Sequence, residues 1–221
     1  MYDSAERFPP PKCHPDTRVA IQKEIQDWVV DPGSAHSVFW LRASAGEGKS
    51  AIMQSIAQLL SSPDGNIVAT FFFGRGWGIR TQGQYLFSTL AYQLAMNIPD
   101  LRFHIDQIMR LRPTLPSSSM DIQVRFLFVE AFARLGYLPS IPWTIIIDGL
   151  DGCDIESHLQ AILNLIGEIV TIHHLPLRFL IASRPEPHIR QIFEGPILHG
   201  VTFCATISDH FDSSTDVEKF L

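Results

Sequence analysis

Short apolar runs alternate along the chain with longer segments in which apolar and polar positions are mixed. Five short runs are apolar at nearly every position: residues 37–41, 67–73, 143–147, 177–182 and 201–205. Between them, apolar side chains recur with helical spacing, as at Ile21, Ile25, Trp28 and Val29. Strands that are apolar on both faces and alternate with amphipathic helices are typical of a parallel sheet covered on both sides. The pattern predicts an α/β fold.

The predicted helices are placed by this spacing and by the turn residues that separate them. Asp16 or Thr17 is expected to cap the first helix, and the second carries Ile52, Ile56 and Leu59 on one face. The helices are expected over residues 17–29, 49–60, 82–96, 100–110, 120–135, 155–169 and 187–193, with a last one beginning near residue 213.

The length of 221 residues fits one large domain. Residues 1–15 are rich in proline and have no periodicity, so they are expected to form a flexible leader. Residues 16–221 then form the domain. Since 46% of the residues are apolar and 18% are charged, a sizeable core is expected and extended disorder is not.

The charge balance narrows the choice of partners. Lys and Arg number 17 and Asp and Glu 23, a formal net charge of −6, without basic runs. This argues against a protein that coats nucleic acid or a membrane surface.

No apolar run is long enough to span a bilayer, and no secretory signal is visible at the N-terminus. The three cysteines, Cys13, Cys153 and Cys204, form no CxxC pair, which favours reduced thiols in the cytoplasm. The histidines include no HExxH pattern, so a metal site built on histidine is not expected.

The candidate chemistry is concentrated between the first predicted strand and the helix after it. The loop Ala-Ser-Ala-Gly-Glu-Gly-Lys-Ser is close to the P-loop pattern GxxxxGK[ST]. Small residues let backbone N–H groups converge on an anion, and the helix N-terminus adds donors and the positive end of its dipole. Lys49 would neutralise outer phosphates, and the Ser50 hydroxyl would ligate Mg²⁺. The alternative is an ordinary strand-to-helix turn. The expected phosphate-binding residues are Ala43, Ser44, Ala45, Gly46, Glu47, Gly48, Lys49, Ser50 and Ala51.

A P-loop needs a further carboxylate from a neighbouring strand end to hold Mg²⁺. The apolar strand 143–147 runs directly into Asp148, which would bind the metal directly or through its water ligands. Asp151 follows three residues later and would position water or a group behind the metal ligands. The alternative is that these acids, with Asp154, cap the helix that follows.

Two arginines follow predicted strands and are candidates for contact with the terminal phosphate. Arg184 comes directly after the fourth strand, and its guanidinium can bind phosphate with two parallel hydrogen bonds. Arg75, in the loop after Phe71-Phe72-Phe73, is the weaker candidate. For both, the alternative is a surface arginine without a role in binding.

These blocks resemble, in order, the NACHT-type NTPase domain of fungal STAND proteins, near the nephrocystin-like N-terminal group. The resemblance covers roughly residues 12–221. It rests on residues 13–18 (Cys-His-Pro-Asp-Thr-Arg), the P-loop, 71–73 with Arg75, 88–94 (Ser-Thr-Leu-Ala-Tyr-Gln-Leu), 147–153 (Ile-Asp-Gly-Leu-Asp-Gly-Cys) and 182–185 (Ala-Ser-Arg-Pro).

The resemblance implies a three-layer P-loop NTPase fold of the additional-strand type, with a five-stranded parallel sheet in the order 5-1-4-3-2. It also implies binding of ATP or GTP with Mg²⁺, and a switch role in signalling in which nucleotide exchange drives oligomerisation. Protein partners or self-association are therefore expected. Asp148, Asp151 and Arg184 take the catalytic positions, and Ser50 with Asp148 takes the metal position.

The sequence departs from the family pattern at three places. Ala43 stands where the first loop glycine is usual, at a cost of about 1 kcal/mol if that position needs a positive φ. Gly152 stands where an acid usually follows Asp151, which puts hydrolysis in doubt more than binding. The chain ends at Leu221, before any winged helix or repeat region, so we expect a domain truncated after its nucleotide-binding part.

Two functions from different classes fit these observations. The first is nucleotide binding with slow or conditional hydrolysis, favoured by Lys49, Ser50, Asp148 and Arg184. The second is a pseudo-NTPase that acts as a protein-interaction scaffold, favoured by Ala43 and Gly152. A small GTPase is disfavoured because none of the asparagines, Asn66, Asn97 and Asn164, precedes a lysine. A nucleotide kinase is not excluded by the P-loop itself, and nothing in the sequence reads the base.

Overall fold

The sheet is the centre of the molecule. A computed structural model describes residues 9–14, 17–60, 66–74 and 81–210 of the chain. Within them, five parallel strands form one sheet in the order β2-β3-β4-β1-β5. This is the order 5-1-4-3-2 read from the other edge, so the expected fold class and strand order are confirmed. The strands are β1 (Val38–Arg42), β2 (Ile67–Phe72), β3 (Trp143–Asp148), β4 (Leu177–Ser183) and β5 (Thr202–Thr206).

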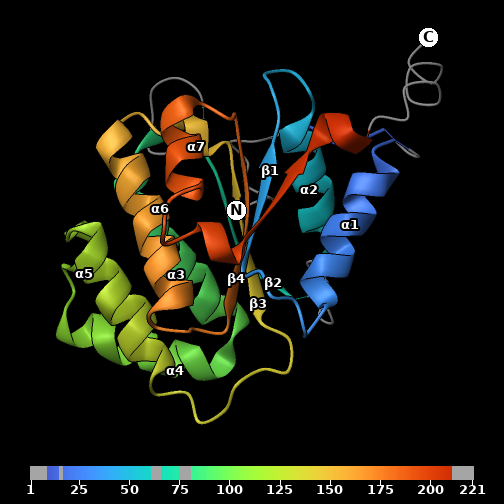
Figure 1. Cartoon of the computed structure of the whole chain (residues 1–221). Helices are drawn as coiled ribbons and strands as arrows, with labels where there is room; N and C mark the ends of the chain where they lie inside the picture. The colour runs from blue at the N-terminus through green and yellow to red at the C-terminus, as the bar shows by residue number, and fades with distance from the viewer. Residues whose placement is uncertain (1–8, 15–16, 61–65, 75–80, 211–221) are drawn as a thin grey trace.

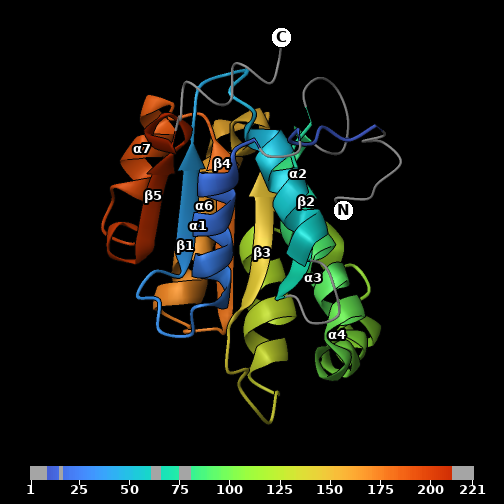
Figure 2. The same ribbon diagram turned by 90° about the vertical axis from the view of Figure 1, so that its right-hand side faces the viewer.

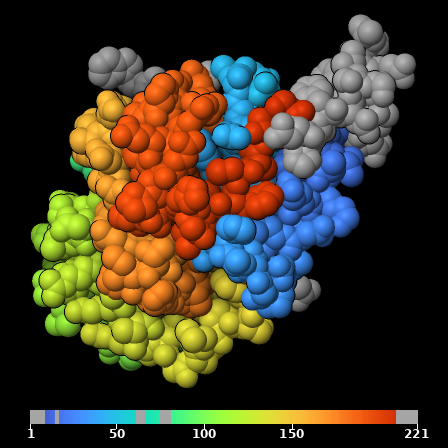
Figure 3. Space-filling model, in the orientation of Figure 1, coloured from blue at the N-terminus to red at the C-terminus, as the bar shows by residue number. Residues whose placement is uncertain are grey.

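Helices cover both faces of the sheet, as the sequence pattern predicts (Figure 1). Two helices, α1 (Val19–Val30) and α2 (Lys49–Leu60), lie on one face. The other face carries α3 (Leu86–Asn97), α4 (Pro99–Leu111), α5 (Met120–Val124), α6 (Glu156–Thr171) and α7 (Pro187–Phe193). Figure 3 shows α7 and β5, in orange to red, packed between α6 and the blue N-terminal part of the chain.

The strands are buried on both faces, and successive side chains enter two separate cores. In β1, Trp40 enters the core beneath α3 and α6, whereas Phe39 and Leu41 enter the core beneath α1 and α2. In β4, Phe179 and Leu180 divide in the same way. Because a parallel strand buries both faces, its sequence is continuously apolar and does not alternate.

The edge strand β2 is closed by polar side chains of α3. Gln93 Nε2 donates to the backbone carbonyl of Thr70 at 2.9 Å, and its Oε1 accepts from the Thr70 N–H at 3.0 Å. Asn97 Nδ2 donates to the Val68 carbonyl at 2.7 Å. These bonds satisfy backbone groups that an edge strand otherwise leaves without a partner strand, so α3 occupies the position of a neighbouring strand.

A buried arginine ties α1 to the sheet. Arg178 on β4 is 2% exposed, and its guanidinium donates to the carbonyls of Trp28 at 2.8 Å, Val29 at 3.2 Å and Asp31 at 2.6 Å. The carbonyls at the end of a helix have no partner within the helix. The side chain therefore caps the C-terminus of α1 from within the sheet.

Several helix boundaries differ from the sequence-based expectation. Thr17 does not cap α1, because its hydroxyl donates to the His14 carbonyl at 2.8 Å and Arg18, with φ 58°, stands at the N-cap. Leu59 is 54% exposed, and the buried face of α2 includes Met53 and Ala57 instead. The expected helix 82–96 begins with a 3₁₀ turn over Gly83–Tyr85, and the expected helix 120–135 contains a π-helical stretch over Arg125–Glu130.

Some predicted features lie outside the described residues. They are the leader up to residue 8 with residues 15 and 16, the loop that holds Arg75, and the helix expected from residue 213. Residues 9–14 contact α2, since the Cys13 N–H donates to Ser55 Oγ at 3.2 Å. All three cysteines are described and are free thiols.

Candidate functional site

The loop between β1 and α2 takes a conformation that only glycine adopts easily. Gly46 has φ +85° and Gly48 has φ +89°, and a Cβ at either position would meet no atom within 4 Å. The need for glycine is therefore set by the backbone and not by crowding. Left-handed residues that alternate with right-handed ones turn successive N–H groups toward one side, which makes an anion-binding concavity. The loop ends where α2 begins at Lys49, so the helix N-terminus adds its free N–H groups.

Ala43 does not strain this loop. Its φ is not left-handed, its side chain is 3% exposed, and it packs in the core beneath α1 and α2. Its N–H donates to the Ser183 carbonyl at 3.4 Å, which continues the pairing of β1 with β4. The departure from the glycine pattern therefore carries no conformational cost at this position.

The Lys49 ammonium is held at the start of the loop. Its Nζ donates to the carbonyls of Ala43 at 2.5 Å and Ser44 at 2.8 Å. Burial lowers the pKa of Lys49 below its usual value, while the carboxylates of Asp151, Asp148 and Glu47 act in the opposite direction. The cation is thus partly desolvated within a group of acids, a setting in which contact with an anion is strengthened.

Glu47 folds back over the loop. Its Oε2 accepts a hydrogen bond from the Ser44 N–H at 2.6 Å. The Arg18 guanidinium reaches the Glu47 carbonyl at 3.5 Å, so the residue before α1 also touches the loop. These contacts fix the outer turn of the loop without using the N–H groups at the start of α2.

Asp148 lies beside the loop because of the strand order. It ends β3, pairs with Ala182 on β4, and Ala182 in turn pairs with Leu41 on β1. Figure 2 shows these strand ends at the same edge of the sheet. The Asp148 side chain is 4% exposed. One pocket of about 320 Å³ at this edge brings the predicted residues together, lined by Lys49, Ser50, Asp148 and Asp151 with Pro11, Phe72, Phe73, Gly74, Gly149 and Gly152.

Asp151 is joined to Arg184. Its Oδ1 accepts from the Arg184 backbone N–H at 3.0 Å, and its Oδ2 lies 3.0 Å from the Arg184 Nε. The alternative in which the acids cap the next helix is wrong, because α6 has Ile155 at its N-cap without a side-chain bond. Asp154 instead accepts from the Thr81 hydroxyl at 3.3 Å. Arg184 does not line the pocket itself and reaches it through Asp151.

Gly152 packs closely against the segment after β2. A Cβ there would lie 3.0 Å from the Gly74 carbonyl and 3.4 Å from the Phe73 Cβ. Both neighbours belong to the segment after β2 that lines the same pocket. An acid at this position would displace that segment, so the departure at Gly152 changes the pocket wall and not only its charge.

Two contributions to the site were not found in the sequence. Pro11, from the expected leader, forms part of the pocket wall. Trp40 is buried, donates from Nε1 to Ser183 Oγ at 2.9 Å, and stacks on Phe193 with ring centroids 4.1 Å apart. These contacts hold the end of β4, and with it Arg184, against the strand that carries the loop. No sequence signal links Trp40 to Ser183, 143 residues away.

The residues present fit a Mg²⁺ ion bound together with phosphates. Ser50 and Asp148 supply a hydroxyl and a carboxylate oxygen in one pocket. Within the described part of the chain, no three His, Cys, Asp or Glu side chains form a metal-binding group. Mg²⁺ is commonly held by one or two protein ligands, with phosphate oxygens and water completing its shell. The donor set therefore suits a metal that arrives with its phosphates.

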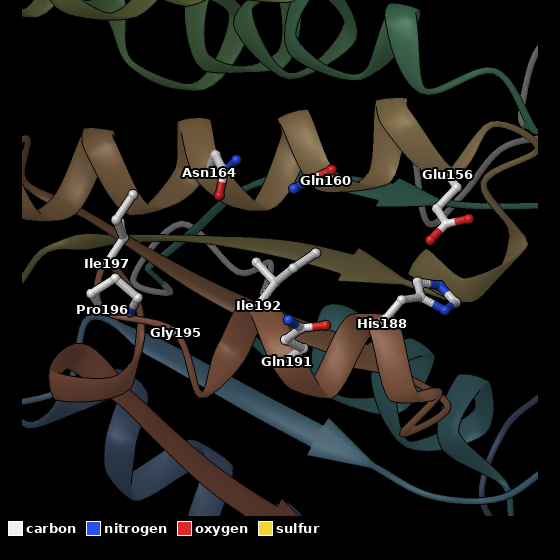
Figure 4. Close-up of a pocket in the computed structure, with 9 residues that line it drawn as sticks. All are labelled: Glu156, Gln160, Asn164, His188, Gln191, Ile192, Gly195, Pro196 and Ile197. Atoms are coloured by element: carbon white, nitrogen blue, oxygen red, sulfur yellow. The ribbon is translucent and has the colours of Figure 1, made fainter.

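A second pocket, of about 370 Å³, contains none of the predicted residues (Figure 4). It lies between α6 and α7, where Gln160 and Asn164 of α6 face Gln191 and Ile192 of α7. It is built from different elements than the pocket at Lys49.

The parallel sheet, its strand order and the glycine loop define an α/β protein of the P-loop-like, three-layer type. The sequence profile of the family described as "Nephrocystin 3, N-terminal" matches residues 18–184. The chain belongs to this family. The matched range includes the whole loop, Asp148, Asp151 and Arg184. A search of curated proteins finds no match. Among the described residues, no helix has both the length and the apolar character needed to cross a bilayer.

Proposed function

We propose that this chain binds a purine nucleoside triphosphate, ATP or GTP, with Mg²⁺ in the pocket at Lys49. One observation carries the proposal: a loop with left-handed Gly46 and Gly48 leads into a helix whose first residue, Lys49, shares a pocket with Asp148. Converging N–H groups, a desolvated ammonium and a buried carboxylate are the chemistry that a metal-bound polyphosphate requires.

Each residue takes a role that follows from its place. The N–H groups of residues 46–50 bind phosphate oxygens, whereas the Ala51 N–H donates to the Gly48 carbonyl at 3.1 Å. Lys49 exchanges its carbonyl partners for the outer phosphates. Ser50 and Asp148 hold Mg²⁺, which when bound neutralises phosphate charge and orients the phosphates. Arg184, which does not line the pocket itself, contacts the terminal phosphate from its place beside Asp151.

We propose that hydrolysis is slow or conditional. A carboxylate positions attacking water best when its oxygens are available. Both oxygens of Asp151 contact Arg184, and Gly152 supplies no acid. Within its family, the chain then acts as a NACHT-type switch module of a cytoplasmic STAND signalling protein, in which the bound nucleotide and not its turnover sets the state.

A thermal unfolding assay tests the binding. Mg-ATP or Mg-GTP at about 100 times its dissociation constant stabilises the protein by about 2.7 kcal/mol, or roughly 5–10 °C in Tm. Lys49→Ala removes the shift. Lys23→Ala, which deletes an exposed lysine paired with Asp27 on α1, keeps it. No shift of the unaltered protein with ATP, GTP or ADP would leave only the scaffold function.

The metal role has its own test. Asp148→Asn keeps the shape of the side chain and removes its charge. We expect this variant to lose affinity for nucleotide in Mg²⁺ and to change little in EDTA. An equal loss in both conditions would contradict a metal role for Asp148.

The second candidate function is a catalytically inactive scaffold that associates with itself. A groove of about 610 Å³ between α3 and α4 favours it, with an apolar lining that includes Tyr92 and Met96, 59% and 52% exposed. Arg102 and Asp106 lie on the same groove, one helical turn apart and both exposed. A two-fold pair of chains requires a self-complementary surface, and we propose that this pair joins each Arg102 to the partner's Asp106.

Light scattering of charge-reversal variants tests this association. Arg102→Asp or Asp106→Arg alone should give monomers, because each places like charges together across the two-fold axis. The double variant should restore the dimer. A monomer mass for the unaltered chain at all concentrations rejects the self-association.

A further inference from the structure

Asp151 contacts Arg184 at two points, and neither contact uses the two terminal nitrogens of the guanidinium. One carboxylate oxygen accepts from the backbone N–H and the other lies 3.0 Å from the side-chain Nε. The side chain of Asp151 is 10% exposed and that of Arg184 is 34% exposed. The contact at Nε is an ion pair without hydrogen-bond geometry. It restricts the guanidinium to the vicinity of Asp151, while the two terminal nitrogens keep donors for another acceptor.

Asp151 lies at the phosphate site, and Arg184 lies directly beside Asp151 without lining the pocket itself. Asp151 lines the pocket with Lys49 and Ser50, and Arg184 follows β4, the strand between the loop strand β1 and the Asp148 strand β3. Both groups act on the Lys49 ammonium, since Asp151 raises and Arg184 lowers its pKa. Arg184 is therefore close enough for its charge to be felt by the residue that binds outer phosphates.

The water-positioning role expected for Asp151 does not use this geometry. Its two oxygens already contact Arg184, and it is the only carboxylate of its loop that lines the pocket, because residue 152 is glycine. A carboxylate that orients an arginine pre-organises it and reduces the entropy lost when the arginine binds. The same carboxylate is poorly placed to accept a proton from water.

We propose that Asp151 is a positioning residue that sets the preference for nucleoside triphosphate over diphosphate by orienting Arg184 toward the third phosphate. The inference rests on the proposed function and adds to it the residue that distinguishes the two nucleotide states. Arg184 makes the contact that only the triphosphate offers, and Asp151 acts through Arg184 without touching nucleotide.

Affinities for Mg-ADP and for the Mg complex of a non-hydrolysable ATP analogue, measured by calorimetry, test the inference. We expect Asp151→Asn to reduce the triphosphate-to-diphosphate affinity ratio by about five- to tenfold, the size of one charge-assisted contact at a partly exposed site. Arg184→Ala should give the same reduction, and the double variant no further one, because both changes remove one contact. Asp154→Asn is the matched control, since Asp154 bonds to Thr81, and it should keep the ratio.

These measurements distinguish failure of the positioning role of Asp151 from failure of nucleotide binding by the chain. An unchanged or increased ratio in Asp151→Asn overturns the positioning role, an increase meaning that Asp151 competes with the phosphate. Equal weakening of both nucleotides also overturns it, since that marks a metal role. If Asp151→Asn does not fold, Asp151→Glu replaces it and must also lower the ratio, and an unchanged ratio again rejects the inference. Absence of nucleotide binding by the unaltered chain overturns the proposed function and this inference with it.

Discussion

Replacing Gly48 by alanine isolates the part of the site that depends on backbone conformation. With φ +89° and no atom within 4 Å of an added Cβ, the substitution meets no steric clash. Its cost comes only from placing an L-residue in the left-handed region, about 1–2 kcal/mol. For a chain of this size the cost corresponds to a Tm lowered by roughly 2–8 °C.

Gly136→Ala is the control for this variant. Gly136 is exposed, has no neighbour within 4 Å of an added Cβ, and does not have a left-handed φ. Alanine there should be neutral or should stabilise by up to about 1 kcal/mol, because it restricts the unfolded chain. Urea denaturation of both variants gives the two free energies of unfolding.

The same variant links the loop conformation to binding. If alanine draws residue 48 out of the left-handed region, the N–H groups no longer converge, and the stabilisation by Mg-ATP should fall with the free energy of unfolding. A Gly48→Ala protein as stable as Gly136→Ala, with full stabilisation by nucleotide, would show that neither folding nor binding needs the left-handed loop.

Three further predictions concern stability and pH. Arg178→Met should lower the free energy of unfolding by about 2–4 kcal/mol in urea denaturation, because buried carbonyls at the end of α1 lose their donor; a loss below about 0.5 kcal/mol would contradict the capping role. Gln93→Leu should cost roughly 1–3 kcal/mol in the same assay, since Thr70 on the edge strand loses both side-chain bonds; unchanged stability would reject this. Because burial lowers the pKa of Lys49 and only the protonated ammonium binds phosphate, nucleotide affinity should be full below its folded-state pKa and fall as pH rises through it. Calorimetry over a pH series that rises toward the usual lysine pKa of 10.5 should show this fall in the unaltered protein and not in Lys49→Met; equal slopes would refute the assignment.

The sheet was predictable because burial on both faces leaves a direct trace in the sequence. The runs that contain Trp40, Ile146 and Leu180 have no polar alternation, and this identifies central parallel strands. The positions of the glycine loop and of Asp148 follow from the same reasoning, since each stands at the end of such a run. The strand order came from the family resemblance, because spacing alone does not fix it.

What the sequence missed depends on backbone angles and on distant contacts. The φ of Ala43 decides whether its methyl group is tolerated, and no residue type reveals that angle. Thr17 has the side chain of a helix cap, yet the chain turns at Arg18 and the cap is not used. The pairing of Asp151 with Arg184 joins residues 33 positions apart, so the sequence predicted two separate roles where the structure has one paired unit.

Calorimetric titration of the unaltered chain and of Lys49→Ala with Mg-ATP and Mg-GTP tests the central claim most directly. We expect saturable binding of at least one of these nucleotides at one site per chain. Lys49→Ala should weaken this binding by at least about tenfold, the loss expected for one charge-assisted phosphate contact. Absence of saturable binding with both nucleotides, or an equal affinity in the Lys49→Ala protein, would contradict it.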